Sequence, residues 1–410
     1  MRVLIQYEFL KIVRRKSTWI VLAASLILTA VFFGLPVVQF QTYSQDGVLR
    51  GLAGIQYERE LQEDDSVLLT DEYIAENVQE VQELFSDPGS VGNDGSEEIL
   101  IGDAYWEGIA PRERLLDLIA GNYANPNESA GYNKLRDLDV SEGSSFYQAR
   151  LDKIEKILNA FSGGLSEPEK HYWRTMNSKV ETPFAYGYFQ GWSTLISCFE
   201  LLLFPILAIC IILCPAFSGE YQSGTDPVLR SARYGKTKLA KAKTMASLLF
   251  GLLVFSVHII LAFGITLAAY GREGWNLPLQ INGTTVPYPL TFLEGTLVGL
   301  AVIYLVLLAM IGLTLFLSAR MKNPYFVLTI VVPVLFIPMF LSPNGTTGIY
   351  NLIVLLTPYQ SLVPRFGSYF SRRIGSLVLD GFAMRAILYG LLTLFFFLFA
   401  GRGFRRHQDV

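Results

Sequence analysis

Long apolar runs separated by polar segments occupy most of this chain outside residues 41–188. A helix needs about 20 predominantly apolar residues to cross the hydrocarbon core of a bilayer. Six runs meet or approach that length and predict six transmembrane helices, at residues 19–40, 192–217, 245–269, 292–318, 325–341 and 382–401. The fifth run is the shortest and contains Pro333 and Pro338. The pattern predicts an all-α polytopic membrane protein.

Residues 349–363 form a seventh apolar segment, which is short and is interrupted by Pro358. Its length suits a re-entrant or interfacial hairpin better than a full crossing. Six crossings conflict with the usual cytoplasmic excess of Lys and Arg, because they leave four arginines outside or at the outer rim: Arg365, Arg372, Arg373 and Arg385. A seventh crossing would bring these inside but would expel the arginine cluster at residues 402–406. We therefore prefer six crossings with both termini in the cytoplasm.

The N-terminal segment has its own pattern. Within residues 1–16, four apolar side chains recur at helical spacing beside several basic ones: Val3, Leu4, Tyr7 and Leu10. This pattern favours an amphipathic helix on the cytoplasmic leaflet, although a simple basic flank of the first span would carry the same charges. The apolar run that follows is longer than the apolar core of a signal peptide. We expect an uncleaved first span, with residues 1–40 as one unit.

Residues 41–188 differ from the rest of the chain in charge. They contain 28 acidic and 12 basic residues, a net charge of −16, whereas the remaining residues carry +13. A segment of this size is large enough for one folded domain. The three cysteines, Cys198, Cys210 and Cys214, all lie in the second apolar run, so no disulfide can stabilise this segment. We expect an acidic extracellular domain, followed by the membrane part at residues 189–410.

Helical periodicity predicts that this acidic domain is mainly α-helical. One apolar stripe follows a candidate cap at Thr70: Ile74, Val78, Val81 and Phe85. A second stripe follows Ser144: Tyr147, Leu151, Ile154, Leu158 and Phe161. Ser166 and Glu169 have the spacing of a capping box that opens a third helix. Residues 88–95 and 122–131 are rich in Gly, Pro and Asn and predict loops.

Composition and motif content exclude several classes of protein. With 51% hydrophobic and 13% aromatic residues in 410, the chain is too apolar for a soluble protein. Gly235, Lys236 and Thr237 spell the end of a phosphate loop, but Arg230 stands where that motif needs a glycine. The three histidines are far apart in the sequence, and no metal-binding or catalytic motif occurs. We expect no enzyme, no metal, no bound cofactor and no nucleic-acid partner.

The connector between the second and third apolar runs, residues 217–243, is the most informative segment. Six basic residues between positions 230 and 243 oppose only two acidic residues in the connector, which marks it as cytoplasmic. The residues that matter most are Glu220, Tyr221, Ser223, Gly224, Thr225, Asp226 and Arg233. An acidic residue followed by a tight turn suits a short helix that leaves the bilayer and contacts a soluble partner. A purely topological loop is the alternative.

The sequence Glu-x-x-Ser-Gly-Thr at residues 220–225, the N-terminal helix and the six-span plan resemble the membrane subunit of ABC-2 type ABC transporters. The resemblance implies that the connector is a coupling helix that docks on a separate ATPase subunit, where ATP and Mg²⁺ bind. It also implies an elbow helix at the N-terminus and a re-entrant pair of helices before the last span. Asp226-Pro227 departs from the apolar residues that usually follow Gly-Thr in this family.

By this resemblance the chain is a permease subunit, chiefly of export type, in a bacterial plasma membrane. A second permease subunit, identical or different, would complete the pathway within the membrane lipid. The alternative is a membrane-anchored receptor or scaffold whose acidic domain binds a ligand or partner. That domain would either capture a cationic ligand or keep the outer surface hydrated and take part in gating.

Three ionisable residues lie inside or at the edges of the predicted spans: Glu200, His258 and Glu294. Charged groups in a bilayer usually face a cavity or a partner, so each is a candidate for the transport pathway. Glu294 also suits a rim position, and His258 suits a packed, neutral histidine between helices. Glu200, about two turns into its span, is the best of the three candidates.

Overall fold

The computed structural model describes residues 1–62, 66–93, 95, 97–126, 128, 130–139, 145–160, 164–231 and 235–406. The protein is mostly helical, with 71% of residues in helices and 8% in strands. Five described segments are long and apolar enough to cross a membrane: Lys16–Gln39, Gln190–Ala216, Thr237–Tyr270, Phe292–Ser318 and Gly381–Gly401. They overlap five of the six predicted runs, and the chain is therefore a helical membrane protein.

The remaining predicted run, the fifth along the chain, forms a shorter apolar segment, Pro324–Phe340. It consists of α16 (Pro324–Phe336) and a 3₁₀ turn, η8 (Ile337–Phe340). Pro333 lies inside α16 and Pro338 inside η8. Proline lacks the N–H donor and clashes with the preceding helical turn, which explains why the regular helix ends early. The prediction of six long spans is thus met for five.

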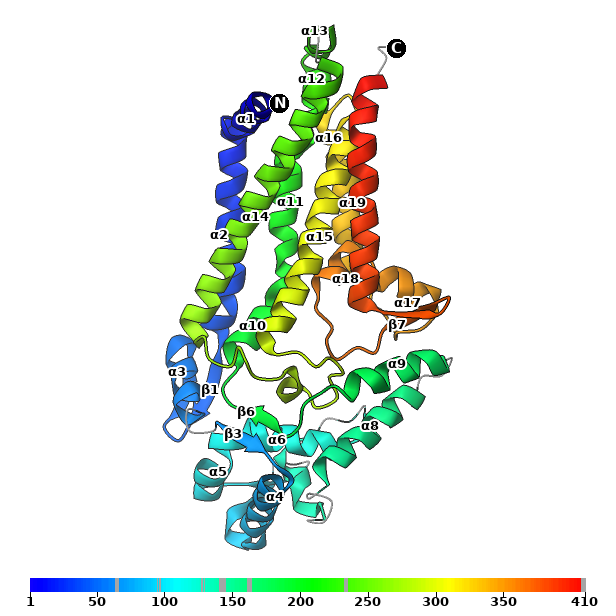
Figure 1. Ribbon diagram of the computed structural model, residues 1–410. Coiled ribbons are helices and arrows are strands. Elements are labelled where there is room, and N and C mark those ends of the chain that lie inside the picture. Colours follow the sequence, from blue (N-terminus) through cyan, green and yellow to red (C-terminus); the bar gives the residue numbers. More distant parts are fainter. Residues whose placement is uncertain are drawn as a thin grey trace.

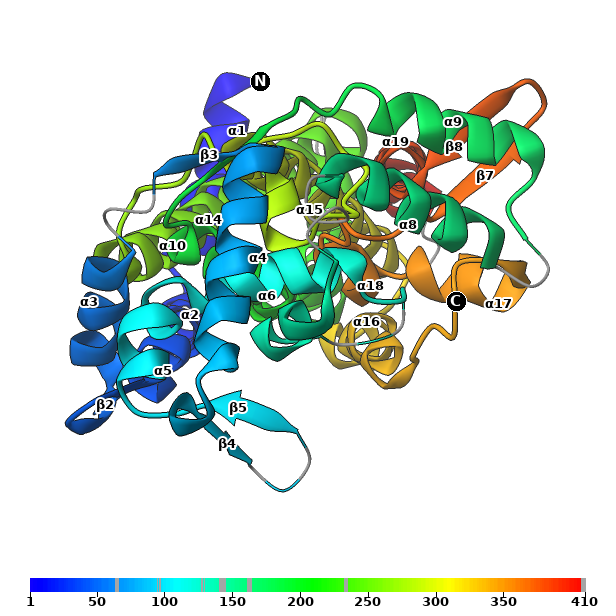
Figure 2. The same ribbon diagram turned by 90° about the horizontal axis from the view of Figure 1, so that it is seen from below.

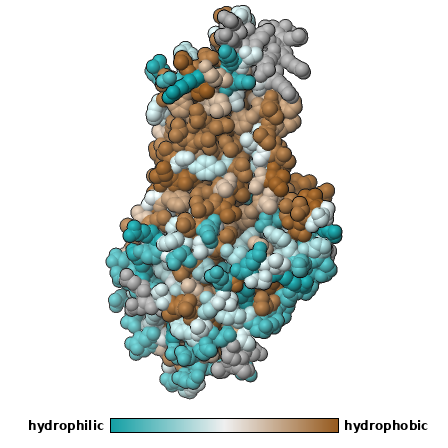
Figure 3. Space-filling view, in the orientation of Figure 1, coloured by the Kyte–Doolittle hydropathy of each residue, from teal (hydrophilic) through white to brown (hydrophobic). Residues whose placement is uncertain are grey.

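The long helices run side by side, and polar elements lie at both ends of the molecule (Figure 1). At one end lie α1 (Arg2–Val13), the connector before α14 (Ala240–Tyr270) and the last described turns of α19 (Gly381–Arg406). Residues 41–188 lie at the opposite end. Figure 3 shows a broad apolar belt over the helices between two more hydrophilic ends.

The second span and α15 (Phe292–Ser318) are the central helices. The second span is built from four consecutive pieces: α10 (Gln190–Ser197), η4 (Cys198–Leu202), α11 (Leu203–Leu213) and η5 (Cys214–Ala216). In the most apolar stretches of this span and of α15, 61% and 56% of residues are buried, against 22% in α2 (Lys16–Gln39) and 17% in α19. The exposed faces of α2 and α19 are apolar, as expected for helices that face lipid.

The acidic segment, which we call the outer region (residues 41–188), combines helices with short strand pairs. Its helices are α3 (Gly51–Leu61), α4 (Asp71–Ser86), α5 (Asp103–Gly108), α6 (Glu113–Tyr123), α8 (Phe146–Ala160) and α9 (Glu167–Asn177). The 3₁₀ turns are η1 (Pro88–Ser90), η2 (Ala110–Arg112) and η3 (Tyr132–Asp137). The antiparallel pairs are β1 (Gln41–Ser44) with β2 (Gly47–Arg50), β3 (Val67–Leu69) with β6 (Phe184–Tyr186), and β4 (Val91–Asn93) with β5 (Glu98–Leu100).

The predicted helices of the outer region are confirmed. Thr70 caps α4, because its Oγ1 accepts a hydrogen bond from the Tyr73 N–H at 3.2 Å. Ser166 and Glu169 form the predicted capping box of α9. The second predicted stripe lies on α8, although Ser144 and Phe161 fall outside the described residues. The strands were not predicted, because three-residue strands are too short for a clear alternation of apolar positions. Residues 88–95, which were predicted to be a loop, contain η1 and β4.

The base of the outer region is completed by segments from the membrane part. These are the loop that contains η7 (Leu279–Asn282) and the hairpin of β7 (Ser371–Ile374) and β8 (Leu377–Asp380). Trp173 Nε1 donates to Ser371 Oγ at 3.1 Å, and its ring packs edge-on against Tyr288 and Tyr369. Figure 2 shows β7 and β8 beside α9. One hydrophobic cluster therefore continues from the outer region into the spans.

Two short helices precede that hairpin. They are α17 (Gly348–Leu355) and α18 (Pro358–Leu362), in the segment predicted to be re-entrant. Gln360, Ser361 and Leu362 of α18 are buried, whereas Ile349 and Ile353 of α17 are 77% and 62% exposed. The segment is therefore a broken helical pair, in which α18 is packed and α17 exposes one apolar face while Asn351, Val354 and Leu355 are buried.

Candidate functional site

Residues 218–231 of the connector form two short helices joined by a tight turn. α12 (Ser218–Gln222) is capped by Ser223 and followed by Gly224, which has φ +66°, a left-handed conformation that favours glycine. The Thr225 N–H donates to the Glu220 carbonyl oxygen at 3.1 Å, and the Gly224 N–H donates to that of Tyr221, also at 3.1 Å. These two bonds are those of a Schellman motif. The turn leads into α13 (Asp226–Ser231).

Glu220 lies in a buried ionic cluster rather than on the surface. Its Oε1 is 2.6 Å from Lys243 Nζ of α14 and 3.0 Å from Lys11 Nζ of α1. Lys243 Nζ is also 3.0 Å from Glu8 Oε2 of α1 and donates to the Ala216 carbonyl oxygen at 3.1 Å. The side chains of Glu220 and Lys243 are 5% and 3% exposed. The cluster therefore joins α1, the connector and α14 through charges that have little access to water.

A second set of contacts fixes the start of the connector to the end of α15. Ser318 Oγ accepts hydrogen bonds from the N–H groups of Phe217 and Ser218, both at 3.0 Å, and donates to the Cys214 carbonyl oxygen at 2.6 Å. Tyr221 Oη donates to the Ala319 carbonyl oxygen at 3.1 Å. The kink at η5 frees these backbone groups, and Ser318 satisfies them. The connector is thus attached to α15 as well as to α1 and α14.

The far end of the connector is exposed. Val228 of α13 is 74% exposed, and Pro227 beside it is also exposed. Ser223, Gly224 and Thr225 are exposed in the turn, and the Ser223 and Thr225 hydroxyls lie 2.9 Å apart. Asp226 is buried, and Arg233 lies outside the described residues. The predicted coupling residues therefore divide into an anchor at Glu220 and Tyr221 and an exposed tip that includes Val228, which the sequence analysis did not single out.

The three pathway candidates have separate environments. Glu200 lies in η4, and its Oε2 accepts a hydrogen bond from Tyr359 Oη of α18 at 3.0 Å. His258 is fully buried between α14 and α2, where Nδ1 donates to the Val254 carbonyl oxygen at 2.8 Å and Nε2 lies 3.0 Å from Ser25 Oγ. Glu294 forms a capping box with Thr291 at the start of α15. No hydrogen bond or ion pair recorded among the described residues joins any two of the three.

Sequence reasoning missed the partners of Glu220. Lys11 lies on α1, 209 residues before Glu220, and Lys243 lies in the first turn of α14. Glu8 of α1 joins the cluster through its ion pair with Lys243. One signal was present, because Glu8 is the only acidic residue in the first 40 and interrupts a basic, apolar segment. Ser318, inside an apolar run, gave no comparable signal. Within the described residues no cluster of three or more metal-ligating side chains occurs.

Comparison of this chain with protein-family models, with curated proteins and with solved structures found no match.

Proposed function

We propose that this chain is the membrane subunit of an ABC-2 type ABC transporter and that residues 217–243 dock on a separate ATPase subunit. The observation that carries the proposal is the attachment of residues 217–221, the start of the connector, to three helices at once. Glu220 binds Lys11 of α1 and Lys243 of α14, while Ser318 of α15 holds the chain just before Glu220. A displacement of the exposed tip at Val228 would therefore reach the membrane helices through short, buried contacts.

The proposed topology places the connector and both termini in the cytoplasm and the outer region outside. Val3 and Tyr7 of α1 are exposed whereas Glu8 and Ile12 face the protein, which supports an elbow helix with an apolar side toward lipid. α16 with η8 would be the fifth of the six crossings. α17, whose exposed apolar side chains form part of the brown surface at the right of Figure 3, would lie at the outer interface.

In this proposal two permease subunits enclose the pathway and the direction is export. Glu200 remains the best pathway candidate, because a carboxylate within a span meets a tyrosine of the α17–α18 pair. His258 and Glu294 each have a local structural role, as an interhelical contact and as a helix cap. ATP and Mg²⁺ would bind to the ATPase subunit.

The test uses the exposed tip, where a substitution leaves the packing of the chain unchanged. The proposal requires a stand-alone ATPase subunit, which is sought among the neighbouring genes and co-expressed with this chain, and the complex is purified through a tag on the permease. Val228→Asp places a charge at the centre of the proposed interface and should reduce ATPase recovery at least about tenfold. Val48→Asp makes the same change at an exposed position of the outer region and should have no effect. Equal recovery with both variants would contradict docking at this connector.

A further inference from the structure

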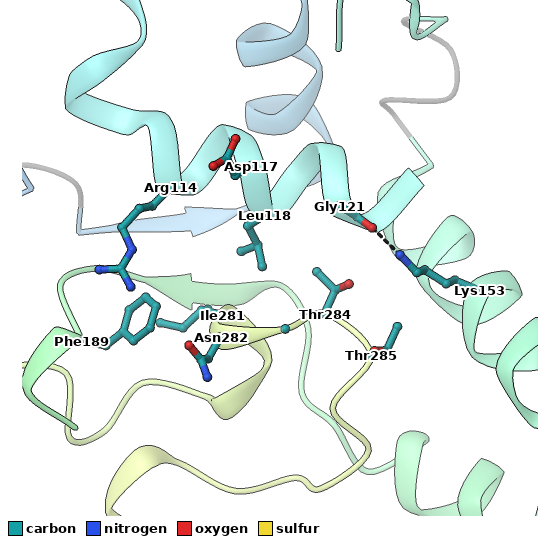
Figure 4. Close-up of a pocket in the computed structure, with 11 residues that line it drawn as sticks. Arg114, Asp117, Leu118, Gly121, Lys153, Phe189, Ile281, Asn282, Thr284 and Thr285 are labelled. Carbon is teal, nitrogen blue, oxygen red and sulfur yellow. Dashed lines mark hydrogen bonds between the residues drawn. The ribbon is translucent and has the colours of Figure 1, made fainter. Parts of the chain in front are cut away.

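A cavity of about 390 Å³ lies where the outer region meets the loop before α15 (Figure 4). One wall is α6, and the opposite wall is the loop at residues 281–285 together with Phe189. Lys153 of α8 closes one side. The volume is within the range of sites for small molecules. The cavity is at the other end of the molecule from the connector, so the inference below does not depend on the proposed function.

Two cations line this cavity. Arg114 lies over the Phe189 ring, with its guanidinium carbon 4.9 Å from the ring centroid. Lys153 Nζ donates to the Gly121 carbonyl oxygen, and Glu128 acts on it only at longer range. Neither forms an ion pair with a carboxylate in the part of the chain that the structure describes. Unpaired cations are unexpected here, because acidic residues outnumber basic ones by 28 to 12 in the outer region.

A third cation lies directly behind the cavity wall. Arg150 is 2% exposed, and its Nε donates to the Thr284 carbonyl oxygen at 2.6 Å. Its other recorded acceptors are Asn177 Oδ1 at 3.0 Å and the Val286 carbonyl oxygen at 3.5 Å. Among the described residues its partners are neutral, so its charge adds to the positive potential at Thr284. Arg150 therefore both shapes the loop and strengthens the field at the cavity.

The cavity lining contains a single carboxylate, Asp117. Its Oδ1 accepts a hydrogen bond from the Tyr132 N–H at 2.9 Å, and Figure 4 shows the group on the side of α6 away from Phe189. Burial raises the pKa of Asp117 above its ordinary value. Asp117 Oδ1 is thus bound to backbone, and among the described residues no ion pair joins Asp117 to Arg114 or Lys153. The remaining lining is apolar at Leu118 and Ile281 and polar at the loop.

We propose that this cavity binds a small organic anion, a phosphate or carboxylate attached to an apolar group. Arg114 and Lys153 bind the anionic group by charge-assisted hydrogen bonds. Leu118, Phe189 and Ile281 contact the apolar part. The ligand bridges the outer region and the loop before α15, two segments that are otherwise joined here by Arg150 and Thr284.

The test is calorimetric titration of the full chain in detergent with phenyl phosphate. Arg114→Gln and Lys153→Gln should each weaken binding about tenfold or more, because each removes a charged donor. Asp117→Asn keeps an acceptor for the Tyr132 N–H, removes the opposing charge and should strengthen binding. Arg136→Gln, a control at an exposed arginine of the outer region, should leave the affinity unchanged.

Two competitors complete the test. Benzyl alcohol and benzyltrimethylammonium have the same aromatic group without the anion and should not displace phenyl phosphate. Nanodiscs with phosphatidylglycerol, compared with phosphatidylcholine alone, distinguish a lipid headgroup from a soluble anion, because a headgroup ligand would suppress phenyl phosphate binding. Absence of binding, equal affinity in all variants, or stronger binding of the cation would overturn the proposal.

Discussion

At the scale of single residues, the ionic cluster around Lys243 is the most consequential arrangement in the membrane part. Removing two charges from water costs several kcal/mol per ion, and only close partners offset that cost. Lys243 offsets it by contacting Glu220, Glu8 and a carbonyl oxygen together. The cluster therefore fixes the position of α1 relative to the connector. Loss of any one charged member would leave the remaining charges with fewer partners.

Removal of Lys243 tests this view. Lys243→Met would leave Glu220 and Glu8 buried with fewer partners and should lower the free energy of unfolding by about 3–5 kcal/mol. Lys11→Met removes a partner whose side chain is 38% exposed and should cost about 1 kcal/mol or less. Thermal unfolding of the detergent-solubilised chain, followed by intrinsic fluorescence, measures both. Similar losses in the two variants would contradict a cluster centred on Lys243.

The turn at Gly224 supports a second residue-scale prediction. Because Gly224 has φ +66°, Gly224→Ala should destabilise the connector by about 1 kcal/mol. Gly264 lies within α14, has ordinary helical geometry and has no atom within 4 Å of the site of an added Cβ. Gly264→Ala should therefore be neutral or slightly stabilising. Hydrogen exchange of residues 218–231 would report the difference, with faster exchange expected only for the Gly224 variant.

At the scale of elements, the connector depends on α15 for its position. The second span breaks at η5, where Pro215 departs from helical geometry, and the chain leaves the bundle there. Ser318, at the end of α15, accepts the two N–H groups that this break exposes. A helix end buried without such partners would be unstable. The end of the second span is thus hydrogen-bonded to the end of α15 at the point where the connector begins.

Ser318→Ala should remove the hydrogen bonds between the end of the second span and α15. The N–H groups of Phe217 and Ser218 would then be buried without an acceptor, and each such group costs about 1–3 kcal/mol. The matched control is Ser178→Ala, because Ser178 Oγ makes only an exposed bond to the Thr175 carbonyl oxygen. Thermal unfolding should show a clear loss for the first variant and almost none for the second. An unchanged unfolding temperature for Ser318→Ala would mean that water replaces the serine hydroxyl.

At the scale of the whole molecule, the two ends of the helical bundle consist of different elements. The outer region lies at one end, and α1, the connector and the last described turns of α19 lie at the other (Figure 1). The outer region is not an independent appendage, because Arg150 and Trp173 form hydrogen bonds with Thr284 and Ser371 of the membrane part. A movement of the spans would therefore be transmitted to the outer region through these hydrogen bonds.

Labelling of single cysteines tests the proposed topology. In a variant whose three buried cysteines are replaced, a membrane-impermeant maleimide added to intact cells should modify cysteine placed at Ser90 or Asn344 but not at Ser231. Permeabilised cells provide the control, since all three positions should then react. Reaction at Ser231 in intact cells would place the connector outside and would contradict its role as an ATPase contact.

The sequence by itself located the five long apolar helices, although it predicted a sixth, and it separated the acidic segment from the spans. These features depend on local hydropathy, periodicity and capping, as at Thr70 and Ser166, which can be read over one or two turns. It also identified the connector as unusual. It did not identify the short strands, whose three or four residues carry too little pattern.

Only the tertiary structure decided which distant residues meet. The sequence contains Glu220, Lys243, Glu8 and Lys11, but it does not indicate that the four form one ionic cluster. Likewise, Arg114, Lys153 and residues 281–285 surround one cavity because the outer region folds back onto the loop before α15. Hydropathy is a property of each segment alone, whereas ion pairing and cavity formation depend on the packing of segments that are far apart in the chain. That is the physical reason why the spans were predictable and the cluster and cavity were not.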